Sequence, residues 1–383
     1  MIVVTHGTIA LRNLQAQIDG FEPVIASRHM RIEERVQLIE LLTLRGLILG
    51  NVADYERAQG LAHQLVREAT ADAAAFLARA RTRAVFHRFA DALDDIDVAE
   101  RLGADAETVE REQAAVLQGL GRYAEAFAIR EEGARRHPNF ESLGALAMLC
   151  AESGDSERAL RMHSESLRRY REASPLPLAV LEFQIGTMWM HQGELDRARD
   201  HLIAARHYVP AYAPAQGHLA EVEAELGNIE TAAALLRPLA MSSDDPDYAA
   251  QLARILADLG SAADSSYWRQ LAARRYDKLV ALHPEAFADH AAEFWLGAGA
   301  DPRMALRLAR INFANRKTPR AHALLSRAVA ACAECQSDPG LRVIPNASVA
   351  AGPSFTAAQI PMVEEGCPGR AESPRYTFVS RYR

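Results

Sequence analysis

The stretch "GELDRARDHLIAARHYVP", residues 193–210, has a counterpart 72 residues earlier in "GRYAEAFAIREEGARRHP", residues 121–138. Both stretches have 18 residues, begin with Gly, end with Pro and carry Ala five residues after the Gly. Recurrence at a fixed spacing marks repeat proteins, in which one small structural unit is stacked many times. If this chain is such a stack, its function depends on binding surfaces rather than on catalysis.

The alanine that follows the glycine recurs along most of the chain. Successive members of the series are separated by 34, 34, 33, 39, 34, 33 and 40 residues, so five of the seven steps fall within one residue of 34. The series consists of Ala58, Ala92, Ala126, Ala159, Ala198, Ala232, Ser265 and Ala305. Twelve positions before seven of these lies a second small residue, at Gly46, Ala80, Ala114, Ala147, Gly186, Ala220 and Ala253.

Each unit of the series reads as two antiparallel helices. Apolar residues are spaced by three and four in "LEFQIGTMWM" and in "DHLIAARHYV", as on one face of a helix. Small residues are needed where two such helices cross closely, because a large side chain would push the backbones apart. Pro138 and Pro210 end the second helix, since Pro cannot continue the hydrogen-bond ladder.

This pattern closely resembles the tetratricopeptide repeat. The family places a Leu-Gly pair in its first helix, Gly-Asp-Tyr-x-x-Ala at the turn and Pro at the end, and "LGRYAEA", "GELDRA", "VADYERA" and Pro210 match these features. The resemblance covers roughly residues 39–330, about eight repeats. It implies an all-α solenoid, a right-handed superhelix of antiparallel helix pairs. Helical repeats of 35 residues that bind RNA would be expected to carry a basic surface instead.

The two ends of the chain differ from the repeats. Residues 1–38 are expected to form an N-terminal capping segment and residues 39–333 the solenoid, which closes with a final unpaired helix. Residues 334–383 are rich in Pro and Gly and lose helical periodicity, so they predict an irregular, disordered C-terminal tail. Two alternatives stay open for this tail: it lies back in the groove as a built-in ligand, or it is altered relative to an ancestor with a complete ninth repeat.

Composition excludes several classes of function. The formal charge of −7 and the pI near 6.0 argue against a general nucleic-acid binder and a polybasic membrane anchor. No apolar run is long enough to span a bilayer, and the first residues lack the basic region of a signal peptide. Four Cys are too few for a disulfide framework. A cytoplasmic protein is the resulting prediction.

Motifs that carry chemistry are weak or missing. "GLGRYA" has the spacing of a dinucleotide-binding fingerprint, but helical sequence precedes it where that motif needs a strand. Cys332 and Cys335 could form half of a zinc site, but only Cys367 and His322 remain as further ligands, without a second paired spacing. We find no catalytic constellation, and we predict no enzymatic activity, no cofactor and no metal. Stoichiometric bound zinc would reverse the last expectation.

The resemblance implies where a partner binds, because the first helices of such repeats line a concave groove. Counted from each anchor alanine, the inward candidates are Arg81, Arg111, Glu152, Phe183, Thr187, Met190, His191, Glu221, Glu225, Arg254, Asp258, His290 and Phe294. The Lys and Asn residues with which some family members clamp the C-terminal carboxylate of chaperones are absent from the corresponding positions.

These residues suggest a non-catalytic scaffold that binds a peptide segment or a partner domain. The acidic groups of the later repeats around Phe183 and Met190 would complement a partner with a basic segment and an apolar anchor. Two alternatives remain: a structural module that associates with itself, and, less favoured, an enzyme or metal protein that uses the C-terminal Cys pair.

Overall fold

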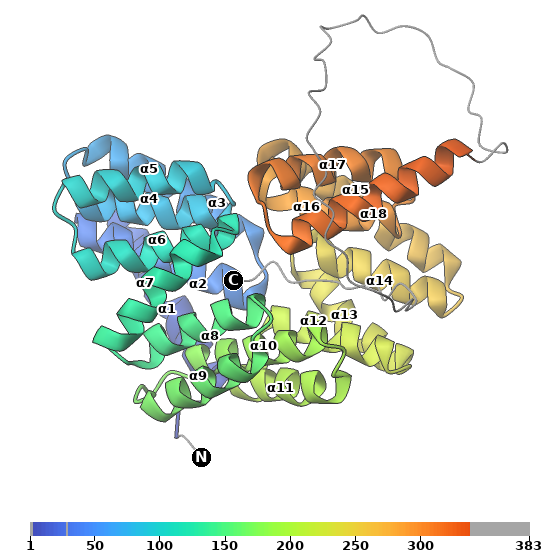
Figure 1. Ribbon diagram of the computed structural model, residues 1–383, viewed down its shortest axis with the longest axis horizontal. Helices are drawn as coiled ribbons and strands as arrows, with labels where there is room; N and C mark the ends of the chain where they lie inside the picture. Colours follow the sequence, from blue (N-terminus) through green and yellow to red (C-terminus); the bar gives the residue numbers. More distant parts are fainter. Residues whose placement is uncertain (1–2, 28–29, 338–383) are drawn as a thin grey trace, which may run out of the picture.

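The computed structural model describes residues 3–27 and 30–337, and these residues form eighteen helices and no strand (Figure 1). The expectation of a disordered tail falls mainly on residues 338–383, outside the described residues. The helices are α1 (Gly7–Ser27), α2 (Ile32–Leu49), α3 (Val52–Glu68), α4 (Ala73–Val85), α5 (Phe89–Arg101), α6 (Ala106–Leu120), α7 (Tyr123–Arg136), α8 (Phe140–Glu152), α9 (Ser156–Arg169), α10 (Leu176–His191), α11 (Leu195–Tyr208), α12 (Ala213–Glu225), α13 (Ile229–Ser242), α14 (Pro246–Asp258), α15 (Ala262–Leu282), α16 (Pro284–Leu296), α17 (Pro302–Asn315) and α18 (Pro319–Ser337).

Helices α2 to α17 pack as antiparallel pairs, each pair forming one repeat, and this confirms the predicted all-α solenoid. The first repeat helix, α2, begins at Ile32, and α1 packs against it. The helix α18 follows α17 in the position of another first helix. In the described part of the chain, no helix is both long and apolar enough to cross a membrane.

The recurring small residues lie at the helix crossings. Ala198 is 0% exposed in α11 and faces Gly186 of α10. A Cβ atom placed on Gly186 would lie 3.0 Å from Cγ of Leu202 and 3.3 Å from the carbonyl oxygen of Ala198, so even one methyl group would be tight. The 34-residue spacing of small residues therefore follows from the closeness of the two helices in each pair.

The glycines that open the quoted stretches reverse the chain between helices. Gly121 and Gly193 have φ angles of 85° and 75°, in the left-handed region that favours glycine. The second helices end just before the prolines, α7 at Arg136 and α11 at Tyr208. The helix α15 has 21 residues against 14 in α11, about two turns more, and it accounts for the 40-residue step that follows Ser265.

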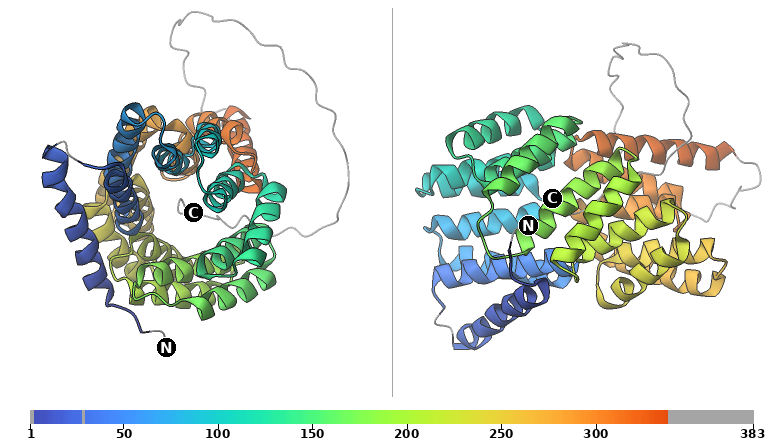
Figure 2. Two further views of the ribbon diagram at one scale, coloured as in Figure 1. Left: turned by 90° about the vertical axis from the view of Figure 1, so that its left-hand side faces the viewer. Right: turned by 90° about the horizontal axis from the view of Figure 1, so that it is seen from below.

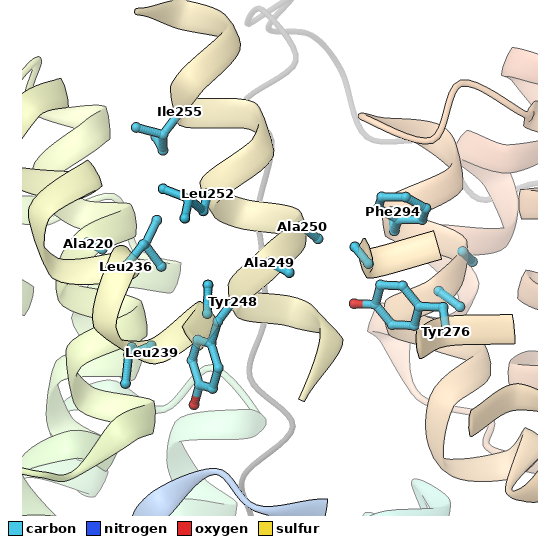
Figure 3. Packing of buried hydrophobic residues seen from close by; sticks show 14 of the residues in the cluster. Ala220, Leu236, Leu239, Tyr248, Ala249, Ala250, Leu252, Ile255, Tyr276 and Phe294 are labelled. Carbon is cyan, nitrogen blue, oxygen red and sulfur yellow. The ribbon is translucent and has the colours of Figure 1, made fainter. Parts of the chain in front are cut away.

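Neighbouring repeats share an apolar core. Figure 3 shows Leu236 of α13 beside Leu252 of α14, and on the other side of α14 the rings of Tyr276 and Phe294, whose centroids are 5.3 Å apart. All four side chains are buried. Because no single helix pair can cover its own apolar face, this stacking supplies most of the stability of the solenoid.

The superhelix returns onto itself, so that residues nearly 200 positions apart are in contact. The amide nitrogens of Val52 and Ala53 donate to the two carboxylate oxygens of Asp244, at 2.6 and 2.9 Å. Farther along, Arg316 Nε donates to the carbonyl oxygen of Gly119 at 3.1 Å. These partners are 191, 192 and 197 residues apart, which means that five to six repeats complete one turn (Figure 2, left).

We call this line of contacts between successive turns the seam. It also includes a hydrogen bond from Asn315 Nδ2 to the carbonyl oxygen of His87, at 2.9 Å. At Gly121 the turns approach so closely that an added Cβ atom would lie 2.9 Å from the carbonyl oxygen of Lys317. The seam therefore fixes the diameter of the ring, not only the packing within each repeat.

The crossing at Ala198 leads to a stability prediction. Replacing Ala198 with Leu should lower the free energy of unfolding by about 1–3 kcal/mol, because the extra atoms enter a closely packed crossing. Chemical denaturation of purified protein measures this. Ala234→Leu, on an exposed position of α13, is the matched control and should change stability little. Equal stability of the two variants would contradict the close packing of α10 and α11 at Ala198.

The seam leads to a second prediction. Asp244→Ala should cost about 1–2 kcal/mol, since it removes the cap of α3, and should speed hydrogen exchange at Val52 and Ala53. Asp155→Ala is the control, because Asp155 caps its own helix α9 by accepting from the amide of Arg158 at 3.0 Å. That variant should leave exchange at Val52 unchanged. Unaltered exchange at Val52 and Ala53 in Asp244→Ala would show that the turns do not touch there in solution.

Candidate binding site

The first helices of the repeats form the inner layer of the ring. They pack side by side, α2 with α4, α4 with α6, α8 with α10, α10 with α12, and α12 with α14. Two cavities lie against this layer where it faces the C-terminal helices. Both are lined by Met148 and Arg316, so they adjoin each other.

The first cavity, which we call the seam cavity, has a volume of about 340 Å³ and lies between the two turns. Its lining from the earlier turn includes Val52, Tyr55, Arg81, Phe86, Phe89, Glu112 and Arg130, and from the later turn Asp245, Ala286, Phe287 and Arg316. Its wall is mostly apolar, with a few charged groups, as is typical of ligand sites. It exists only because the superhelix closes on itself.

Two of the three arginines that line the seam cavity form hydrogen bonds or ion pairs with other residues of the protein. Arg81 Nε donates to Glu112 at 2.9 Å, and the same guanidinium binds Glu40. Arg316 Nε donates to Gly119, and its Nη1 lies 4.0 Å from Oδ2 of Asp289. The positive charges at these two positions are therefore largely balanced within the fold.

The third arginine is different. Arg130 belongs to α7, a helix of the outer layer, yet its side chain lines the seam cavity. Its Nε is buried and meets no hydrogen-bond acceptor among the described residues. Burial lowers the pKa of this guanidinium, and the charges of Glu152 and Glu112 partly oppose that effect.

The buried carboxylate of Asp289 lies beside the seam cavity, close to Arg316. Burial raises the pKa of Asp289, but interactions with His290, Arg320 and Arg316 outweigh it and hold that pKa below its ordinary value. Burial, assisted by the charge of Arg316, lowers the pKa of His87 to about 3, so this histidine is neutral at physiological pH. Asp289 is consequently the anion of the cluster and Arg316 one of its cations.

The second cavity, the groove cavity, has a volume of about 680 Å³ and lies between α8 and α10 on one side and α16 and α18 on the other. Its lining includes Met148, Glu152, Thr187, Met188, His191, Glu293, Arg316, Arg320, Leu324 and Arg327. Glu293 of α16 and Arg327 of α18 form an ion pair in its wall. Burial lowers the pKa of His163 of α9, which also lines this cavity, to about 4.

Four of the predicted groove residues line these cavities. Arg81 lies in the seam cavity, and Glu152, Thr187 and His191 lie in the groove cavity. Arg111 borders a smaller cavity of about 70 Å³ between α6, α7 and α8. Three others, Glu225, Arg254 and Asp258, are exposed and line neither of the two larger cavities.

The other five predicted residues, Phe183, Met190, Glu221, His290 and Phe294, are buried in the helix packing. Phe183, expected as an apolar anchor for a partner, is 1% exposed and packs on the rings of Tyr212 and His218. Glu221 lies 3.3 Å from Nδ1 of His218.

His290 lies 2.7 Å from Asp247, and Phe294 packs on Tyr276. The positional count failed at these five places because α10, α12 and α16 are covered on more than one face. Neighbouring repeats cover one side of these helices, and their own repeat partners cover the other. A side chain that points inward in an open groove is therefore packed in this tighter ring.

The count also missed Arg130, Arg316, Arg320 and Arg327. It was restricted to first helices, whereas Arg130 stands on a second helix. The other three lie between α17 and α18 or on α18, which the count did not include. Nothing local in the sequence relates Arg316 to Gly119, 197 residues away.

No group of three metal-ligating side chains lies together in the described part of the chain. Cys332 is buried in α18, and the side chain of Cys335 is outside the described residues. Gly119 and Gly121 lie at the junction of two helices, α6 and α7, so the "GLGRYA" stretch has no strand before it.

Comparison with known proteins supports the fold. A family model described as the tetratricopeptide repeat matches residues 190–259, and no curated protein matches the chain. Among solved structures, the human IFIT1 dimer with m7Gppp-AAAA is 16% identical, with 83% of this chain and 77% of that chain covered and a TM-score of 0.52.

Two other IFIT1 structures are similar. The human IFIT1 dimer with PPP-AAAA has a TM-score of 0.50 at 16% identity, covering 83% of this chain and 79% of that one. An IFIT1 monomeric mutant with Gppp-AAAA has a TM-score of 0.51 at 17% identity, covering 82% and 76%. At these identities the likeness concerns the fold alone. Residues 190–259 match the tetratricopeptide repeat model, and the 34-residue spacing and stacked helix pairs show the same type of repeat fold from α2 to α17.

Proposed function

We propose that this protein is a non-catalytic scaffold that holds a peptide segment of a partner protein inside its ring. The tetratricopeptide fold supports a protein-interaction role in general. The observation that carries the finer proposal is the pair of adjoining cavities against the inner helices, with apolar walls and a few charged groups. Such walls suit a chain with alternating apolar and polar side chains. A cytoplasmic location is part of the proposal, and Cys150 is a buried free thiol.

The residues that led to the prediction of a partner with a basic segment and an apolar anchor do not support it. Phe183 and Met190 are buried, and the carboxylate of Glu221 is occupied by His218. The carboxylates of Glu112, Asp289 and Glu293 are paired with arginines, whereas Nε of Arg130 has no acceptor among the described residues. The charge of the interior accordingly supports a segment that is neutral or acidic.

RNA is a weaker candidate, although the IFIT1 structures contain capped or triphosphorylated oligoadenylate. The arginines of the cavities stand beside carboxylates: Glu112 beside Arg81, Asp289 beside Arg316 and Glu293 beside Arg327. With a formal charge of −7 over the whole chain, a polyphosphate would meet as much repulsion as attraction.

The proposal can be tested by filling the cavities. A phage-displayed library of random peptides is selected on the wild-type protein, and the affinities of enriched peptides are measured by fluorescence anisotropy. Ala115→Trp fills the seam cavity and Ala323→Trp the groove cavity, both from exposed positions. At least one of them should weaken binding roughly tenfold or more, since the new ring occupies the volume of the ligand.

The controls are Ala128→Trp on α7 and Ala330→Trp on α18, exposed positions that line neither cavity. These two variants should bind like the wild type. A library with no enriched peptide, or unchanged affinity in both cavity-filling variants, would contradict the proposed function.

RNA binding is checked separately with PPP-AAAA, the oligonucleotide in one of the similar structures. We expect no saturable binding to this protein at about 150 mM salt in a filter assay, because the cavity arginines are balanced by carboxylates. Binding in the micromolar range that is lost in Ala115→Trp would favour a nucleic-acid ligand over a peptide.

A further inference from the structure

Arg130 is the one cavity arginine whose charge the described fold leaves poorly compensated. Its side chain lines the seam cavity on the inside and the small cavity between α6, α7 and α8 on the outside, so it passes between the inner helices. Its Nε is buried without an acceptor among the described residues. A guanidinium stays protonated in proteins, so burial without a partner costs free energy.

Two partly buried arginines of earlier repeats are paired with carboxylates. Arg45 Nε donates to Asp54 at 2.8 Å, and Arg79 Nε donates to Asp95 at 2.9 Å. Each of these pairs joins the first and second helix of one repeat. Arg130 stands on the second helix of its repeat, and Glu112 of the first helix, whose charge acts on it, accepts instead from Arg81 of the preceding repeat, at 2.9 Å.

The surroundings of Arg130 indicate which chemical group of a ligand could pair with its guanidinium. The seam cavity has room for one or two side chains at about 340 Å³, and Phe86, Phe89 and Phe287 give it an aromatic wall. Glu112 and Glu152 act on Arg130 from nearby, so a doubly charged phosphate would be repelled more strongly than a carboxylate. A carboxylate on a partly apolar ligand therefore suits the cavity.

We propose that Arg130 receives the carboxylate of an Asp or Glu side chain of the bound peptide, while a neighbouring apolar side chain of that peptide packs on Phe86, Phe89 and Phe287. This inference rests on the proposed function, because it names the chemistry of the peptide held in the ring. Arg130 is then a recognition residue that the free protein keeps at a cost in stability.

The library selection tests the chemistry directly. Peptides enriched on the wild type should carry Asp or Glu next to an apolar residue, and selection on Arg130→Met should lose the acidic residue. Enriched peptides without an acidic residue, or with Lys or Arg in its place, would overturn the inference and leave the proposed function intact. A library with no enriched peptide would contradict the proposed function itself, and this inference with it.

A double-mutant cycle makes the assignment specific. One enriched peptide is synthesised with its acidic residue and, separately, with the matching amide. On the wild type the acidic form should bind roughly tenfold tighter or more. On Arg130→Met the two forms should bind alike, and Arg130→Lys should restore part of the preference because it keeps the charge. The same preference on Arg130→Met as on the wild type would overturn the assignment.

Thermal unfolding distinguishes recognition from a structural role. The unliganded Arg130→Met variant should have a Tm equal to or above that of the wild type, because a buried charge that Glu152 and Glu112 only partly compensate has been removed. Arg135→Met, on the same helix but exposed and paired with Glu132, is the matched control and should change neither Tm nor binding. A lower Tm for Arg130→Met, with both peptide forms weakened equally, would show that Arg130 holds the fold together instead.

Discussion

The contact between successive turns of the superhelix is the constraint on which the inside of this molecule depends. A stack of helix pairs whose turns do not meet has an open concave face, and its inner residues can be listed by counting along the repeat. Here Asp244 caps α3, Arg316 binds the backbone of Gly119, and Gly121 lies against Lys317. These contacts close the ring and leave two adjoining cavities against its inner layer.

Closure also changes which groups a ligand could reach. Phe183, Phe294 and His290 belong to first helices, but neighbouring repeats pack over them, and they contribute to stability rather than to recognition. The side chains that do reach the cavities come partly from elsewhere: Arg130 from an outer helix and Arg316 from the connection before α18. The walls of the cavities are thus formed by residues of several repeats and of both turns.

How much the sequence could predict follows from the range of each interaction. The helix pairs, their crossings and their turns depend on residues within one repeat, so the spacing of Ala198 and Gly186 and the position of Gly193 were sufficient to predict them. The cavities depend on pairs such as Arg316 and Gly119, which are 197 residues apart and follow no local pattern. The rotation from each repeat to the next is small, so no single residue predicts that the turns meet at the seam.

The closeness of Gly121 to the backbone of Lys317 has a consequence for how this protein can change its length. An open repeat protein can gain or lose whole repeats, since each repeat touches only its neighbours. In this ring, inserting or deleting one unit between these two residues would shift every later contact by a full step. Gly121, after α6, and Lys317, after α17, would then no longer lie against each other. Repeats could therefore be added to this molecule without loss of the seam only at the ends of the stack.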